Sequence, residues 1–114
     1  MITELLQFHA QLKLWHWQTL SFAQHNAFGD AYEAIEDPMD ELVEASIGIT
    51  GREKITALDL TINGDLATVN AKILEFKVFL VGLNREFAAY TDILNLRDSI
   101  LGEVDQLLYR LTLS

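Results

Sequence analysis

The chain has 114 residues, half of them hydrophobic, and a formal net charge of −9 from 17 acidic and 8 basic side chains. It contains no cysteine, which excludes disulfides, thiolate metal ligands and cysteine nucleophiles. It shows no signal-peptide pattern and no apolar run near the roughly 18 residues that span a bilayer, and its acidic balance disfavours phosphate backbones. We therefore expect one cytoplasmic domain over residues 1–114 that binds neither nucleic acid nor membranes.

The first predicted helix covers residues 3–18, with Thr3 as its N-cap. His9 falls close to its apolar stripe, where a histidine is more often packed or hydrogen-bonded than metal-bound, and we interpret it so. Trp15 and Trp17 lie well apart around the helix, so one should face the bundle and the other a neighbour or solvent.

A second helix is predicted to begin after a capping box formed by Ser21 and Gln24 and to end at Gly48 and Gly51. Pro38 interrupts it, and because the apolar register continues across this residue, a kink is favoured over a fresh helix start. The apolar arc of this helix consists of Phe28, Ala31, Tyr32, Ile35, Met39, Leu42 and Val43.

Residues 49–64 are the least helical part of the chain, and we expect an ordered long linker with at most a short strand or one helical turn. Asp65 is predicted to cap a third helix that ends near Phe87, and Thr91 or Asp92 caps a fourth of about 20 residues. The predicted core positions are Leu66, Val69, Ile73, Phe76, Leu80 and either Leu83 or Phe87, then Ile93, Leu96, Ile100, Val104, Leu107, Leu108 and Leu111. Four helices with a long second connection describe a bundle, and the broad apolar faces predict self-association.

Asp40 and Glu44 stand one helical turn apart, so their carboxylates can point the same way. They lie roughly 60° and 100° around the second helix from His25, on the border between its apolar and acidic arcs. By spacing alone, such a pair is usually part of a solvated acidic face.

The order of chemical groups in this region is more specific than the spacing of the acids. His16-Trp17 ends the first helix, His25 opens the second, and Asp40 and Glu44 follow within the context Met39-Asp40-Glu41. With Tyr32 and the segment ILGEVDQLLYRL at residues 100–111, these features resemble the Dps-type miniferritins of the ferritin-like superfamily. The resemblance implies an all-α, ferritin-like four-helix bundle with a long connection between helices two and three.

The resemblance also implies a function. In that family the histidines of one chain and the Asp/Glu pair of its partner form a shared ferroxidase centre, here His16 and His25 facing Asp40 and Glu44. Iron is then the implied metal, because imidazole and carboxylate suit Fe(II) and oxygen ligands accommodate the ferric product. The protein is expected to form a homodimer or a larger homo-oligomer such as a hollow cage, in a bacterial cytoplasm. A weaker second resemblance, to short ferritin-like proteins of bacteriophages, would place it in the host cell.

The sequence also departs from the family pattern. Gly29 occupies the position of a further family carboxylate, and Asp30, rotated by about 100°, is a weaker ligand candidate. The first connection is shorter than usual, and the basic N-terminal tail is absent. A second hypothesis is therefore a bundle without catalysis that acts as a protein–protein interaction or assembly module. A third, a binder of small apolar ligands, has no positive support in the sequence, and no catalytic residue can be assigned.

Overall fold

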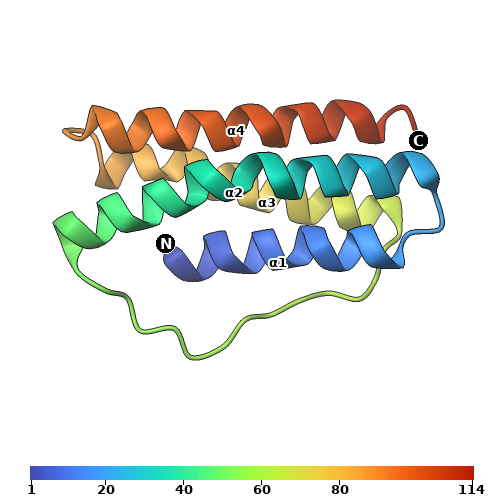
Figure 1. Ribbon diagram of the computed structural model, residues 1–114, viewed down its shortest axis with the longest axis horizontal. Helices are drawn as coiled ribbons and strands as arrows, with labels where there is room; N and C mark the ends of the chain where they lie inside the picture. Colours follow the sequence, from blue (N-terminus) through green and yellow to red (C-terminus); the bar gives the residue numbers. More distant parts are fainter.

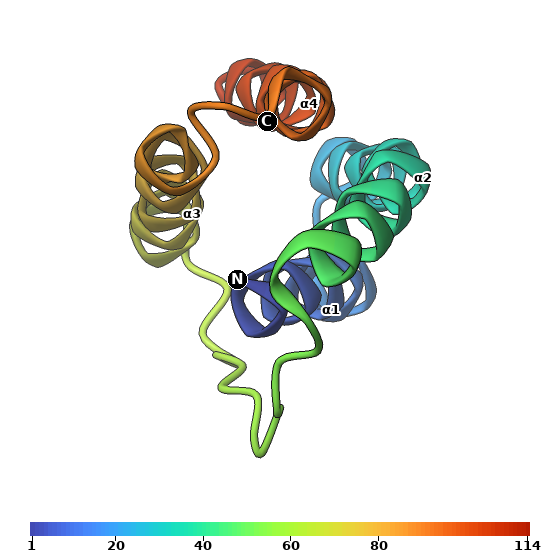
Figure 2. The same cartoon turned by 90° about the vertical axis from the view of Figure 1, so that its left-hand side faces the viewer.

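The computed structural model describes residues 1–114 and contains four helices and no strand: α1 (Ile2–Gln18), α2 (Phe22–Thr50), α3 (Leu66–Glu86) and α4 (Thr91–Leu111). The helices stand around a common core in the order α1, α2, α4, α3 (Figures 1 and 2). The prediction of an all-helical four-helix bundle is thus confirmed. None of the four helices has both the length and the apolar character needed to cross a membrane.

Each helix packs against two neighbours, and the diagonal pairs do not pack directly. The α2–α4 contact is the most extensive and the α1–α3 contact the least. Residues 51–65 contain neither helix nor strand and carry the chain from one end of the bundle to the other, so α3 runs in the same direction as α2 (Figure 1).

The core consists of 20 buried hydrophobic residues drawn from all four helices. The periodicity predicts most of them, but the predicted burial of Leu66 is wrong. This side chain is 42% exposed, because Leu66 is the first residue of α3 and lies where the bundle ends. Two buried polar residues, Gln11 and Arg97, leave no trace in the apolar pattern.

Arg97 ties α4 to α3. Its guanidinium donates to the carbonyl oxygen of Leu80 at 2.7 Å, to Asn84 Oδ1 at 2.6 Å and to Asp98 Oδ1 at 2.8 Å. These acceptors offset the cost of burying the charge, which would be several kcal/mol without them.

The predicted caps of α2 and α3 are confirmed, whereas those of α1 and α4 are wrong: Tyr90 precedes α4, and neither Thr91 nor Asp92 caps it with a side chain. Ser21 Oγ accepts from the Gln24 amide at 3.2 Å, and Asp65 Oδ1 accepts from the Thr68 amide at 2.9 Å. Helix α1, however, begins at Ile2 and not after Thr3, and it has no side-chain cap of its own.

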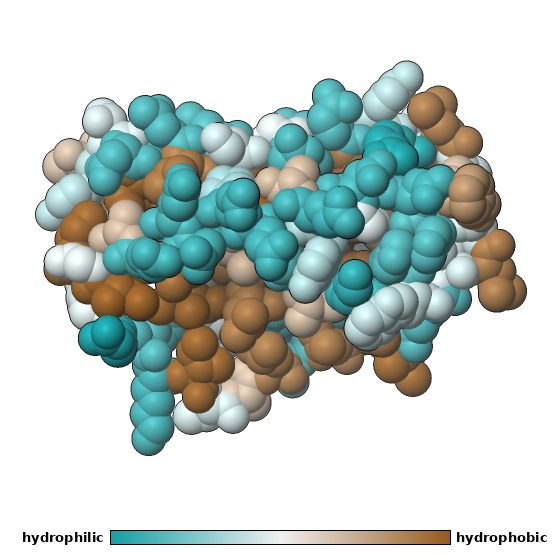
Figure 3. All heavy atoms as spheres, in the orientation of Figure 1, coloured by the Kyte–Doolittle hydropathy of each residue, from teal (hydrophilic) through white to brown (hydrophobic).

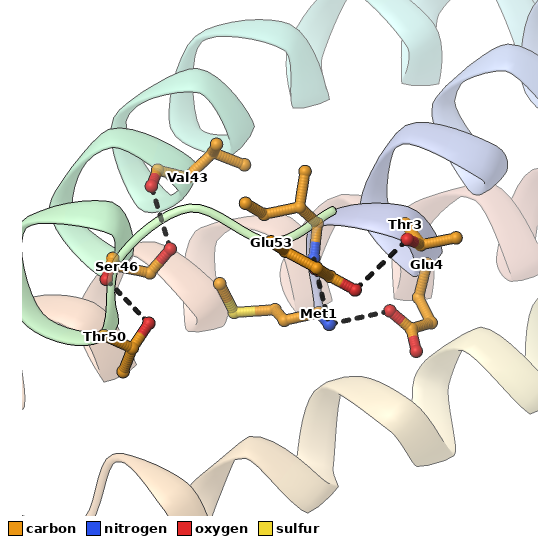
Figure 4. Close-up of polar contacts among 8 residues, drawn as sticks. Met1, Thr3, Glu4, Val43, Ser46, Thr50 and Glu53 are labelled. Atoms are coloured by element: carbon orange, nitrogen blue, oxygen red, sulfur yellow. Dashed lines mark hydrogen bonds and ion pairs between the residues drawn. The ribbon is translucent and has the colours of Figure 1, made fainter. Parts of the chain in front are cut away.

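Glu53 of the connection takes the place of that cap (Figure 4). Its carboxylate accepts from the Ile2 amide at 2.7 Å, from Thr3 Oγ1 at 3.1 Å and from the Met1 ammonium at 3.2 Å. Thr3 therefore donates to the cap and is not the cap itself. A carboxylate at the start of a helix also meets the positive end of the helix dipole.

Helix α2 continues through Pro38 to Thr50, so the alternative of a fresh helix at that residue is wrong. In Figure 1 the second half of α2 runs at an angle to the first. Gly51 ends the helix with φ 83°, a conformation that glycine adopts without the steric cost of a side chain. Gly48, which we expected to share this role, lies inside the helix.

The connection is held against α1 by two glutamines one helical turn apart. Gln7 Oε1 accepts from the Asp59 amide at 2.8 Å, while Gln11 accepts from the Thr61 amide at 2.8 Å and donates to the Thr61 carbonyl at 2.9 Å. Four residues of helix rise about 6 Å and two residues of extended chain about 6.6 Å, so the two spacings match.

Candidate functional site

The two predicted histidine ligands lie together where α1 ends and α2 begins. Their rings stack with centroids 3.8 Å apart and an angle of 18° between the planes. The Nδ1 atom of His16 lies 2.6 Å from the carbonyl oxygen of His25, and the Nδ1 atom of His25 lies 2.8 Å from the carbonyl oxygen of His16. Each histidine thus fixes the ring of the other through its backbone.

This reciprocal pairing sets the chemistry of both rings. A carbonyl oxygen only accepts hydrogen bonds, so each Nδ1 carries a proton and donates it. In the neutral imidazole the lone pair then resides on Nε2, which is the arrangement that metal-binding histidines adopt when a backbone carbonyl orients them. Neither Nε2 atom of His16 or His25 has a hydrogen-bond partner within the chain.

Gly29 provides the space in which the His16 ring lies. A Cβ atom at position 29 would come 2.8 Å from His16 Cε1 and 2.9 Å from His16 Nδ1, closer than side-chain atoms approach one another. A carboxylate at this position and the present orientation of His16 therefore exclude each other. The histidine pair in this arrangement therefore requires a glycine at position 29.

Asp40 and Glu44 form the second half of the predicted site, on the exposed face of α2. Hydrogen bonding to Asp40, followed by repulsion from its charge and smaller effects of desolvation and Glu41, raises the pKa of Glu44. The repulsion from Asp40 that helps to raise the pKa of Glu44 would be relieved by a bound cation. Exposed acids continue along this face, as the hydrophilic band across Figure 3 shows.

The two halves are far apart within one chain. His25 and Asp40 are separated by fifteen residues of continuous helix, which is about 22 Å along its axis. No group of three or more histidine and acidic side chains comes together in a way that would hold a metal ion. One chain therefore brings the histidines together and the acids together, but not the two pairs.

Asp30, the weaker candidate, is engaged elsewhere. Its Oδ2 atom accepts from Arg110 Nη1 of α4 at 2.6 Å. The carboxylate is thus paired with α4 and not with either histidine.

The remaining histidine is packed, as we interpreted it. His9 is buried, its ring stacks on Tyr32 with centroids 3.8 Å apart, and its Nε2 lies 2.9 Å from the Tyr32 carbonyl oxygen. The Lys13 ammonium lies 4.7 Å from the centre of the same tyrosine ring and 5.6 Å from the centre of the Trp17 ring. Trp17 is 68% exposed and Trp15 only 1%, as the helical spacing requires.

Sequence reasoning missed two features of this region. The role of Gly29 depends on how closely α1 crosses α2, which no local pattern encodes. The spacing leaves open which of Trp15 and Trp17 faces the bundle, and it does not show that the buried indole nitrogen of Trp15 is the one buried polar side-chain atom with no hydrogen-bond partner. An indole N–H in an otherwise apolar stripe was the available signal, since buried tryptophans usually find an acceptor.

No curated protein and no solved structure shows significant similarity to the chain. One family model matches residues 16–111, which includes His16, His25, Asp40 and Glu44 and all of α2, α3 and α4. Its description is a family of unknown function. The match covers most of the chain, and the protein therefore belongs to this family, DUF5856.

Proposed function

We propose that the protein is a Dps/miniferritin-like, ferritin-like bundle that binds Fe(II) between two subunits and oxidises it with dioxygen. His16 and His25 of one chain supply Nε2 atoms, and Asp40 and Glu44 of a second chain supply carboxylate oxygens. Iron is the substrate of the reaction and not a resident cofactor. The mixed nitrogen and oxygen donor set suits ferrous iron and retains the ferric product.

The observation that carries this proposal is the reciprocal hydrogen bonding of the two imidazoles at 2.6 and 2.8 Å. Packing alone does not require the Nε2 lone pairs of both histidines to be free of hydrogen bonds, whereas metal binding does. Here the backbone uses up both Nδ1 protons and leaves the ligating atoms unpaired. The raised pKa of Glu44 supports the other half, because the acidic pair lacks a counter-charge within the chain.

The separation within one chain defines how two chains would have to meet. In an antiparallel pair of α2 helices related by a two-fold axis, His25 lies opposite the Asp40–Glu44 turn when the axis crosses α2 near residue 33. Each dimer then carries two equivalent sites. Glu33 lies on the face of α2 that also carries His25 and Asp40, whereas Ala34 is rotated away by about 100°.

Anaerobic calorimetric titration with Fe(II) tests the ligands. The wild type should bind saturably, and the double variant Asp40→Ala/Glu44→Ala should lose this binding, because two of the four proposed ligand groups are gone. The variant Glu75→Ala/Glu86→Ala removes the same charge from exposed positions of α3 and should bind as the wild type does. Admitting oxygen to the loaded protein then measures oxidation. Equal binding by all three proteins would reject the assigned site.

Cross-linking tests the arrangement of the two chains independently. The chain contains no cysteine, so a single introduced cysteine reports one contact. Glu33→Cys should give disulfide-linked dimers on mild oxidation, and Ala34→Cys, also exposed and on the same helix, should remain largely monomeric. The reverse pattern, or equal cross-linking of both, would rule out the proposed two-fold axis.

The alternative is a ferritin-like bundle without catalysis that acts as a protein–protein interaction or assembly module. The apolar stripe on the outer face of α3 favours it, since Leu74, Val78 and Val81 are 51%, 73% and 47% exposed. Contiguous apolar surface of this kind marks interaction sites. This alternative predicts association that neither Fe(II) nor the loss of Asp40 and Glu44 affects.

A further inference from the structure

Helices α1 and α3 leave a cavity between them. Their contact is the least extensive between neighbours in the bundle, and the connection runs beside it, held to α1 by Gln7 and Gln11. The cavity has a volume of about 360 Å³ and takes its walls from α1, α3 and residues 59–61 of the connection. This volume falls at the lower end of the roughly 300–1,000 Å³ of small-molecule sites. The cavity is therefore of a size for a small organic molecule.

Three phenylalanines form the aromatic wall of this cavity. The rings of Phe8 and Phe76 stack between α1 and α3 with centroids 3.9 Å apart, and the Phe79 ring lies 5.8 Å from that of Phe76. Phe79 is only half-buried, and Leu60 of the connection, which also lines the cavity, is 43% exposed. Apolar surface in the cavity is thus open to an occupant. Such a wall favours an apolar or aromatic group, and aromatic ring faces also attract cations.

The charged side chains of the lining carry a net negative charge. Glu4, Asp59 and Glu75 are acidic, and Lys72 is the one basic residue among them. Two of the three acids have a counter-charge within the chain: Lys72 lies 3.6 Å from Glu75, and the Met1 ammonium lies 2.9 Å from Glu4. On a chain of net charge −9, a lining of this kind repels anions and attracts a cation.

Asp59 is the acid of the lining that forms no ion pair. The residue is exposed, and its backbone amide donates to Gln7 Oε1 at 2.8 Å, which fixes its place in the wall. The backbone amide and carbonyl of Thr61 are both bonded to Gln11. With these backbone groups engaged, the uncompensated negative charge of Asp59 is the main polar feature that the connection offers to an occupant.

We infer that this cavity binds a small aryl-alkyl amine, whose ring packs on the phenylalanine wall and whose ammonium group compensates the charge of Asp59. An anion with the same ring meets repulsion from the lining, and an amine without a ring forgoes the apolar contact. The lining includes none of His16, His25, Asp40 and Glu44, so the inference does not rest on the proposed function.

NMR titration of the full-length, ¹⁵N-labelled protein with phenethylamine tests the inference, in the presence of a chelator so that iron plays no part. The amides of Asp59 and Thr61, both held by glutamines of α1, report on the cavity, and we expect both signals to shift saturably. Two further probes separate the parts of the ligand. Hydrocinnamate keeps the ring and reverses the charge, whereas butylamine keeps the ammonium and lacks the ring. Each should bind at least about tenfold more weakly than phenethylamine.

Two variants provide the matched comparison. Asp59→Asn removes the charge and keeps the backbone amide that Gln7 holds, so the affinity for phenethylamine should fall about fivefold. Asp37→Asn removes the same charge from an exposed position of α2 outside the lining and should bind as the wild type does. Both changes are at exposed positions, where folding tolerates substitution. Equal binding by Asp59→Asn and the wild type, equal affinity for the three probes, or amide signals that phenethylamine leaves unchanged would overturn the inference.

Discussion

The two ends of the bundle differ in whether the chain pairs its own polar groups. Where α1 begins, the connection supplies the carboxylate of Glu53, which accepts from the amide of Ile2 and the hydroxyl of Thr3 (Figure 4). Where α1 ends, the chain leaves the indole N–H of Trp15 and the Nε2 atoms of two histidines without partners. The chain itself completes one end, and at the other end it leaves these three polar atoms without a partner of its own.

The largest expected effect is the difference in stability between two variants, Trp15→Ala and Trp17→Ala. Trp15→Ala deletes a side chain that is 1% exposed and should lower the free energy of unfolding by about 3–5 kcal/mol. Trp17→Ala, two residues along, deletes one that is 68% exposed and should cost less than about 1 kcal/mol. Urea unfolding followed by circular dichroism measures both, and similar losses would contradict the assigned burial.

Gly29→Ala should weaken iron binding while leaving the stability of the protein nearly unchanged. The new Cβ atom displaces the His16 ring, so we expect Fe(II) affinity to fall at least about tenfold, equivalent to about 1.4 kcal/mol. The gain in helix propensity, about 1 kcal/mol, is offset by the lost hydrogen bond, so the unfolding free energy should change little. Gly102→Ala in α4 meets no atom within 4 Å and should stabilise the protein by about 1 kcal/mol without affecting iron. Unchanged iron affinity in Gly29→Ala would refute the role of the histidine pair.

Glu53→Gln should have the smallest effect, and one that depends on pH. Although desolvation acts to raise it, the pKa of Glu53 is lowered by the hydrogen bond from Ile2, the Met1 ammonium and Thr3. A lowered folded-state pKa means that the carboxylate stabilises the fold above the unfolded value of 4.5 and loses this effect as pH falls through the folded value. Because the group is largely exposed, we expect a loss of only about 0.5 kcal/mol at pH 7.

Unfolding of the wild type and Glu53→Gln, measured from pH 7 down to pH 2, checks this dependence. The two curves should converge as the wild-type carboxylate takes up its proton. Glu86→Gln, an exposed acid of α3 with no hydrogen-bond partner in the chain, should track the wild type throughout. A difference between wild type and Glu53→Gln that persists at the lowest pH would show that the carboxylate charge is not its source.

The periodicity and the caps predict the four helices to within a residue or two, because both signals are local. The contacts that these signals do not predict are hydrogen bonds between residues far apart in sequence. Glu53 caps a helix that begins fifty-one residues earlier, and Arg97 finds acceptors on α3. Such polar contacts follow from how the helices pack and leave no repeat in the sequence.

The candidate site likewise has one part that the local sequence predicts and one part that depends on how the helices pack. The acidic pair of Asp40 and Glu44 follows from helical spacing alone, and the structure places both on one exposed face. The stacking of His16 on His25 depends on the close approach of α1 and α2 over Gly29. That the two halves meet across a subunit boundary stays a prediction, since it concerns a second chain.

The two glutamines that hold the connection have a consequence for the order of folding. Gln7 and Gln11 reach partners about fifty residues away, so their hydrogen bonds form only after a large loop has closed. The connection should therefore dock late, on a bundle whose helices are already assembled. In native-state hydrogen exchange, the amides of Asp59 and Thr61 should be slowed while that of Leu60 between them exchanges freely, an alternating pattern in a segment that is not a strand.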